Sequence, residues 1–262
     1  MQRQGSNSPT LTKDQVLAGR GDLSPFLVHL TRTGKVKLWA DIYEIERDDF
    51  RTLSAKACLE RIIEKSAIKA VSPFGYFQYK VPLALPNQLP KNQDSKVKRA
   101  WLRSVCFTET PIDHVHFQMQ KIEGRSLSFQ PYGLAFFEAA IRRKCGNPVF
   151  YFDVGNSLTR ASLDAMAISG DCEKYQKILP LYQSFGRRFD GKPGEIDFRW
   201  EREWRVANDV SFTAADVAFG ICPADEIPYF ENLVGQKFRF VDPRDDMVAV
   251  KNKLRQYVPG IK

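Results

Sequence analysis

The chain has 262 residues, 43% hydrophobic and 12% aromatic, which is enough apolar material to bury a substantial core. Lysine and arginine outnumber aspartate and glutamate by 39 to 31, and the resulting formal charge of +8 favours polyanionic partners, with nucleic acid as the first candidate. The cysteines are scattered without a Cys-x-x-Cys pair and the histidines lack the spacing of tetrahedral ligands, which argues against a disulfide scaffold and a metal site.

The chain opens with a polar stretch, residues 1–24, for which we expect a flexible arm. A single domain with a loop insertion around 72–100 is expected over residues 25–262. The sequence contains neither the apolar core of a signal peptide nor a run of about 18 apolar residues. It therefore predicts a cytoplasmic protein that does not enter a membrane.

Regular structure is expected from Pro25 onward. The apolar, β-rich run Phe26–Thr31 predicts a buried first strand that ends at the turn signal Thr33-Gly34. Ser54 then occupies the position of a helix N-cap, and apolar residues at helical spacing predict a helix from Ala55 to about Ala70.

The region from 72 to 98 is irregular and punctuated by prolines, which is typical of a functional loop. It holds an aromatic cluster and runs into a basic segment that contains Lys96, Lys98, Arg99 and Arg103. Proteins that bind single-stranded nucleic acid combine rings for the bases with cations for the phosphates. Ordinary loop packing explains the same residues equally well, so both interpretations stay open.

Short strands and helices alternate along the rest of the chain. We expect helices after Pro111 and over 138–144, 157–185 and 225–234, and strands at Val105–Thr108, Tyr132–Phe137, Pro148–Phe152, Val217–Ile221 and Phe238–Val241. A basic, glycine-rich loop over 186–194 contains Arg187 and Arg188. Many short strands with few long helices favour the α+β class, with mixed, mostly antiparallel sheets and flanking helices.

The segment after this loop places two acids and two tryptophans in alternation. On a β-strand, Glu201, Glu203 and Arg205 would share one face, and Trp200 and Trp204 would share the other. Two carboxylates side by side suit a reaction in which positive charge develops next to a substrate hydroxyl. The alternative is that the tryptophans face the core and the charged residues form a solvated ladder of ion pairs.

Several short blocks, taken in order, resemble the AbiGi-type abortive phage infection proteins. The blocks are FLVHLTR (26–32), the helix up to Ala70, VCFTETP (105–111), PYGLAF (131–136), NPVFY (147–151) and WEREWRV (200–206). This resemblance implies a toxin or effector in bacterial antiviral defence that acts beside an antitoxin or another protein of the defence system.

The same layout is similar to the ADP-ribosyltransferase fold, in which a first strand holds NAD and a later strand carries a catalytic glutamate. The resemblance implies that Glu203 is the catalytic acid and that Glu201 orients or deprotonates the acceptor. It also implies that the residues that contact NAD are His29, Thr31, Phe107, Thr108 and Tyr132. Such a site requires His29 and Glu203 to face one cleft, whereas a histidine on an apolar strand is more often part of the core.

Three functional hypotheses follow. The first is an enzyme that transfers ADP-ribose from NAD to a macromolecule, with RNA or DNA favoured as the acceptor. The second is a nucleic-acid-binding protein without catalysis, held by Lys96, Lys98, Arg99, Arg103, Arg187 and Arg188. The third is an antitoxin-like interaction protein.

Overall fold

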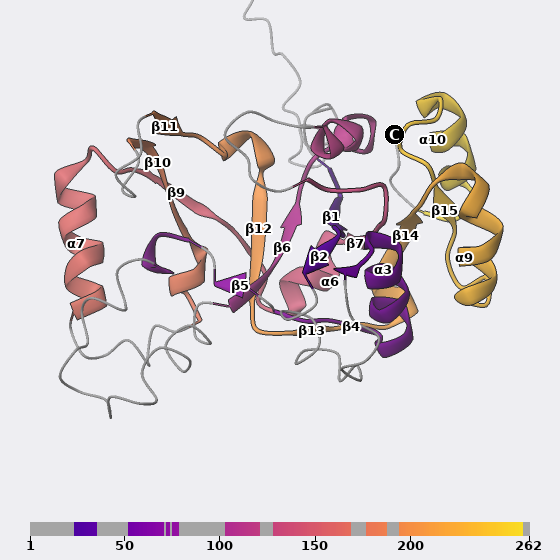
Figure 1. Ribbon diagram of the computed structural model, residues 1–262, viewed down its shortest axis with the longest axis horizontal. Coiled ribbons are helices and arrows are strands. Elements are labelled where there is room, and N and C mark those ends of the chain that lie inside the picture. The colour runs from indigo at the N-terminus through magenta and orange to yellow at the C-terminus, as the bar shows by residue number, and fades with distance from the viewer. Residues whose placement is uncertain are drawn as a thin grey trace, which may run out of the picture.

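The computed structural model of the protein describes residues 24–35, 52–70, 72–73, 75–78, 103–120, 128–168, 177–187 and 194–258. Its centre is an eight-stranded sheet in which seven strands follow the order β15-β14-β7-β1-β6-β12-β8 and β5 pairs with β6 (Figure 1). These strands are β1 (Phe26–Leu30), β5 (Ser72–Pro73), β6 (Arg103–Thr108), β7 (Gly133–Phe137), β8 (Asn147–Pro148), β12 (Glu203–Ala207), β14 (Val217–Ile221) and β15 (Phe240–Val241). The predicted α+β class with a mostly antiparallel sheet is confirmed, because β14 and β15 form the one parallel pair among these described strands.

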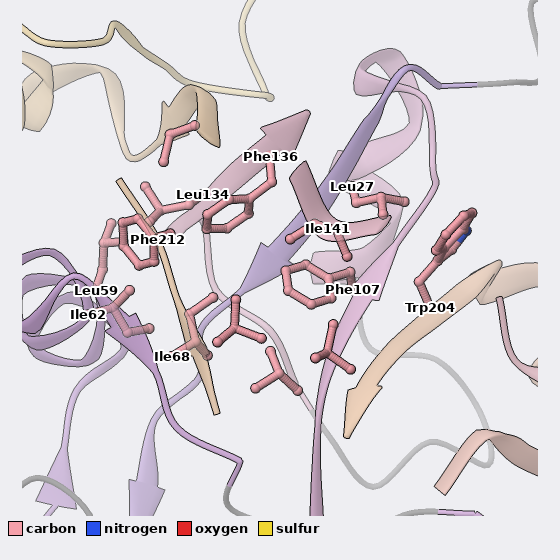
Figure 2. Packing of buried hydrophobic residues seen from close by; sticks show 14 of the residues in the cluster. Leu27, Leu59, Ile62, Ile68, Phe107, Leu134, Phe136, Ile141, Trp204 and Phe212 are labelled. Atoms are coloured by element: carbon pink, nitrogen blue, oxygen red, sulfur yellow. The ribbon is translucent and has the colours of Figure 1, made fainter. Parts of the chain in front are cut away.

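The central strands divide their side chains between two apolar layers, as alternation along a strand requires. One face of the sheet, here called the tryptophan face, carries Leu27, Phe107 and Trp204 (Figure 2). It is covered by α3 (Ala55–Lys65), α6 (Glu138–Arg143) and α9 (Ile227–Leu233), which contribute residues such as Leu59, Ile141 and Phe230 to the same cluster.

The opposite face, here called the glutamate face, carries Val28, Thr108 and Glu203. These three residues share a face because Val28 pairs with Thr108 and Thr108 pairs with Glu203, and directly paired residues point to the same side of a sheet. Part of this face is covered by the 3₁₀ helix η4 (Ile112–Met119) and by α10 (Met247–Arg255).

A second sheet lies beside β12 and consists of β9 (Phe150–Asp153), β10 (Tyr182–Arg187) and β11 (Glu195–Ile196), with β10 in the middle. The helix α7 (Ser157–Ile168) lies on this side of the molecule, and α9 and α10 lie beyond the other edge of the central sheet (Figure 1). Two short ladders complete the described strands: β2 (Gly34–Lys35) with β3 (Thr52–Leu53), and β4 (Ala67–Ile68) with β13 (Val210–Ser211).

The remaining described turns of 3₁₀ helix mark the connections. They are η3 (Tyr76–Gln78), η5 (Leu179–Leu181), η6 (Arg199–Glu201), η7 (Ala214–Asp216) and η8 (Ala224–Glu226). Of these, η6 leads directly into β12, which begins with Glu203, and η5 leads directly into β10 of the second sheet.

Two predicted helices are shorter than the sequence pattern indicated. Ser54 caps α3 as expected, because its side chain accepts a hydrogen bond from the backbone N–H of Ala57 at 3.2 Å. The helix ends at Lys65 rather than near Ala70, because Ser66 adopts a left-handed conformation with φ 48° and its N–H bonds to the last turn. The predicted helix over 157–185 is wrong at its end, where residues 182–187 form β10 and pair with β9.

The predicted strand Pro148–Phe152 is divided between the two sheets. β8 pairs with β12, whereas β9 pairs with β10, and the N–H of Val149 between them donates to the Glu203 carbonyl at 2.9 Å. The predicted strands at β1, β6, β7 and β14 are confirmed. Residues 1–23 of the predicted arm and most of the predicted insertion lie outside the described residues.

Among the helices that the structure describes, each is too short or too polar to cross a lipid bilayer.

Candidate functional site: an aromatic pocket at the end of the sheet

The two predicted catalytic acids do not lie side by side on a strand. Glu201 belongs to η6, and β12 begins only at Glu203, because Arg202 between them has φ 46° and ψ 51°. A left-handed residue interrupts the alternation on which the prediction relied. The prediction that Glu201, Glu203 and Arg205 share a strand face is therefore wrong for Glu201 and holds for the other two.

Glu203 forms a buried ion pair with Arg205. The Arg205 guanidinium donates to both carboxylate oxygens, from Nε at 2.9 Å and from Nη2 at 2.7 Å, and the two side chains are 2% and 12% exposed. Arg205 also donates to the carbonyl of Pro180 and to the side chain of Gln183, so it joins β12 to the second sheet. Burial acts to lower the pKa of Arg205, but the Glu203 carboxylate, with smaller contributions from Cys106 and Tyr151, outweighs this effect and the pKa is raised.

His29 lies on the other side of the sheet from Glu203. It follows Val28 on β1, so it points to the tryptophan face, where its ring centroid is 5.8 Å from that of Phe107. Nδ1 donates to the Cys106 carbonyl at 2.8 Å, and burial lowers the pKa of His29 below its ordinary 6.5. His29 and Glu203 therefore do not face one cleft, which an NAD site built on this pair requires.

The hydroxyl groups of the other predicted NAD contacts are bonded within the protein. Thr31 donates to the carbonyls of Ala55 and Tyr132, and Thr108 donates to the carbonyl of Glu201 at 2.6 Å. The Tyr132 hydroxyl donates to Glu226 at 3.1 Å, and burial together with this carboxylate raises the pKa of Tyr132 to about 12. Phe107 is a core residue of the tryptophan face. These five residues are not gathered around one cavity, and their role in binding NAD stays a prediction.

The predicted nucleic-acid contacts fall mostly outside the described residues, namely Lys96, Lys98, Arg99 and Arg188. Arg103 is exposed at the start of β6, and Arg187 is exposed at the end of β10. They lie on separate sheets. The structure thus shows two of the six cations at the surface, one on each sheet.

A pocket of about 230 Å³ opens where β6 ends and β12 begins. Two exposed rings wall it, Phe117 at 48% exposure and Trp200 at 40%. Its other lining residues are Thr110, Pro111, His114, Gln118 and Arg202. The described part of the chain thus has an open pocket with aromatic walls, and an arginine and a histidine are among its other lining residues.

The strand pairing explains why these residues meet. β6 and β12 are antiparallel, so η4, which follows β6, and η6, which precedes β12, emerge at the same edge of the sheet. Hydrogen bonds from Thr108 Oγ1 to the Glu201 carbonyl and from the Glu109 N–H to the Arg202 carbonyl hold the two segments together. In a 3₁₀ helix residues three apart lie in line, which brings His114 and Phe117 to one side.

Hydrogen bonds hold two of the lining side chains in place. The Trp200 indole N–H donates to the Asp197 carbonyl at 3.0 Å, so the ring stays at the surface. Gln118, a buried residue, donates from Nε2 to the Thr110 hydroxyl at 3.3 Å, and this hydroxyl is 2.6 Å from that of Thr108. The polar groups of Gln118 and Thr110 are therefore hydrogen-bonded within the protein, and the surface that the pocket presents is mostly apolar.

Sequence reasoning missed this pocket because it assigned Trp200 to a strand and to the core. Trp204 is a core residue, as expected, but Trp200 lies in η6 and is exposed. The signal that was available is the segment 112–119 after Pro111, which holds His114, His116, Phe117 and Gln118. In this segment His114 and Phe117 are three residues apart, a spacing that puts both side chains on one side of a 3₁₀ helix.

Comparison of the chain with protein-family models, with curated proteins and with solved structures found no match. The resemblance to abortive infection proteins and to the ADP-ribosyltransferase fold stays a prediction from the sequence. Among the described residues, three or more histidine, cysteine or acidic side chains are nowhere grouped as metal ligands would be.

Proposed function

We propose that this protein binds single-stranded nucleic acid and seats one unstacked base between Trp200 and Phe117. The observation that carries this proposal is the exposure of both rings at the walls of one pocket. Two exposed rings that wall the same pocket offer flat faces on which a base can stack, and every base has such a face.

The size of the pocket favours a single ring system. Sites for drug-sized ligands measure about 300–1,000 Å³ and bury most of the ligand. A pocket of about 230 Å³ lies below that range, so it suits one base and is too small to enclose a dinucleotide such as NAD. The rest of the strand would lie along the outer surface.

The charge of the chain supports a polyanionic ligand. The net charge is +8, and residues 79–102 carry five lysines and arginines against one aspartate. Long-range attraction raises the rate at which a polyanion reaches the surface, while stacking supplies the local contact. This combination favours the nucleic-acid hypothesis over the antitoxin hypothesis, which explains neither feature.

ADP-ribose transfer from NAD receives less support. The proposed acid, Glu203, is already paired with Arg205 and lies across the sheet from His29. This activity stays a prediction, and so does a role in antiviral defence. Labelled NAD mixed with the protein and with separate pools of RNA, DNA and cell protein tests the transfer, since label in any pool would support it.

Binding is tested with a fluorescein-labelled, unstructured 12-nucleotide RNA or DNA and anisotropy measurements. We expect Trp200→Ala and Phe117→Ala each to weaken binding about tenfold or more, because stacking on one ring contributes about 1–3 kcal/mol. Phe150→Ala is the matched control, since Phe150 is 52% exposed on the second sheet and outside the pocket. Equal loss in all three variants, or binding that none of them weakens, would contradict the proposal.

A further inference from the structure

Polar groups of the residues that line the pocket are bonded within the protein. Gln118 Nε2 donates to the Thr110 hydroxyl at 3.3 Å, and this hydroxyl lies 2.6 Å from that of Thr108. The Trp200 indole N–H donates to the Asp197 carbonyl at 3.0 Å. The surface that the pocket offers to a ligand is therefore mostly apolar.

The arginine of the pocket is paired within the protein as well. Arg202 Nη2 lies 3.5 Å from Glu109 Oε1, and Glu109 Oε2 accepts a hydrogen bond from the Trp204 indole N–H at 2.9 Å. Trp204 is a core residue, so the carboxylate that balances Arg202 is held by the packing of the sheet. The guanidinium thus serves the structure at this edge of the sheet.

Rings form the apolar part of the lining. Phe117 is 48% exposed, and its ring centroid lies 4.0 Å from that of His116 and 5.9 Å from that of His114. Pro111, at the start of the same 3₁₀ helix, contributes an apolar ring and has no backbone N–H to donate. A base that enters the pocket therefore gains stacking and apolar contact.

Apolar contact distinguishes bases by a different feature from the one that hydrogen bonds read. Hydrogen bonds read the donors and acceptors on the edge of a base, such as O4 of thymine or the N4 amino group of cytosine. Apolar surface responds to the hydrocarbon on the base, because burial of apolar area is favourable in proportion to the area. Among pyrimidines this feature is the methyl group at C5, which thymine has and uracil lacks, and phenylalanine is one of the side chains that contact it.

We propose that the pocket selects pyrimidines that carry a C5 methyl group, and therefore prefers thymine in single-stranded DNA to uracil, its counterpart in RNA. This inference rests on the proposed function, because the base must first lie between Trp200 and Phe117. In the bound state the faces of the base lie against these two rings, and the methyl group is removed from water. The pocket is open, so the polar group at C4 stays hydrated.

The experiment uses four fluorescein-labelled deoxynucleotide 12-mers, each with a single kind of base: thymine, uracil, cytosine or 5-methylcytosine. Anisotropy titrations at pH 7.5 give the four Kd values. We expect the thymine strand to bind about fourfold more tightly than the uracil strand, a factor that corresponds to about 0.8 kcal/mol for one buried group of methyl size. The 5-methylcytosine strand should gain the same factor over cytosine, and the Kd values for uracil and cytosine should agree within about twofold.

Two variants test whether the methyl group is buried in this pocket. Trp200→Ala and Phe117→Ala each remove one wall, so both methyl ratios should fall below about twofold while binding weakens overall. Phe150→Ala is the control, because Phe150 is 52% exposed on the second sheet and outside the pocket, and its two ratios should stay near about fourfold. Both pocket rings are exposed, so circular dichroism and thermal unfolding of their variants should match the wild type.

The outcomes separate this inference from the proposed function. If none of the four strands binds, nucleic-acid binding itself is overturned, and the inference with it. If all four bind equally well, or if the uracil and cytosine strands differ by more than about twofold, binding stands and selection by the methyl group is overturned. If the methyl ratios survive in both Trp200→Ala and Phe117→Ala, the methyl group is buried elsewhere and the role assigned to the pocket is overturned.

Discussion

Arg205 is a buried charged side chain whose hydrogen bonds join two sheets. It is 2% exposed, and its guanidinium contacts the Glu203 carboxylate, the Pro180 carbonyl and the Gln183 side chain. Gly75 lies against the same group, since a Cβ there would be 2.9 Å from Arg205 Nη1 and 2.4 Å from the Tyr182 carbonyl. A charge in such a place is tolerated only with a counter-charge and filled hydrogen bonds.

Glu203→Gln is therefore expected to destabilise the protein, because it leaves the Arg205 charge buried without its partner. Loss of one partner of a buried pair costs about 3–5 kcal/mol of stability. The glutamine amide can still accept one hydrogen bond from Arg205, so we expect a loss of about 3 kcal/mol. Glu64→Gln is the control, since Glu64 pairs with Arg61 at the surface with 57% exposure, and it should change stability by less than about 0.5 kcal/mol. Urea unfolding followed by circular dichroism measures both.

This result also bears on the catalytic hypothesis. A catalytic acid that is not part of the packing can be replaced by its amide with little loss of stability. A Glu203→Gln protein as stable as the wild type, yet unable to transfer ADP-ribose, would favour catalysis over the structural role described here.

At the scale of elements, left-handed residues decide where several segments end. Arg202 ends η6 and starts β12, and Ser66 ends α3. Neither position carries glycine, the residue that adopts this conformation most readily. At Arg202 the side chain lines a pocket, whereas at Ser66 the exposed side chain makes a 3.4 Å contact with the Ile63 carbonyl.

Ser66→Gly is accordingly expected to stabilise the protein by about 0.5–1 kcal/mol, since it removes the steric cost of the left-handed conformation. Ser54→Ala at the other end of α3 should have the opposite effect and cost about 1 kcal/mol, because it deletes the N-cap bond to Ala57. The two midpoints of urea unfolding should move in opposite directions. A lower midpoint for Ser66→Gly would show that the serine side chain matters more than its backbone strain.

At the scale of the whole molecule, the charge and the pocket act over different distances. The +8 charge attracts a polyanion over about a Debye length, which is about 8 Å at physiological salt, whereas stacking operates only in contact. Salt should therefore weaken every strand alike and leave the contribution of the pocket rings unchanged.

We expect the Kd for a single strand to rise about 20-fold between 50 and 200 mM KCl if three phosphates are neutralised, because the logarithmic slope is about −0.7 for each contact. The ratio of the Kd of Trp200→Ala to that of the wild type should stay constant over this range. Anisotropy titrations at four salt concentrations measure both quantities. A ratio that falls toward one at high salt would mean that Trp200 acts through charge placement rather than stacking.

The sequence by itself determined the local features of this protein. Short apolar runs bounded by turn signals indicated the strands around Leu27, Phe107, Phe136 and Phe219, and Ser54 marked the start of a helix. These features depend on residues within a few positions of one another, where backbone propensity and side-chain period act directly. The α+β class followed from the many short strands and few long helices that these local features indicated.

Tertiary structure alone decided which residues meet. The pairing of Val28 with Thr108 and of Thr108 with Glu203 sets His29 and Glu203 on opposite faces, and one left-handed residue at 202 turns a predicted strand face into a pocket wall. The pairing of β1 with β6 joins segments more than 70 residues apart, so the pattern within either segment does not by itself say which residues pair. A shift of one residue moves a side chain to the other face of a sheet. The sequence could therefore suggest candidate site residues, but it could not show which of them lie together.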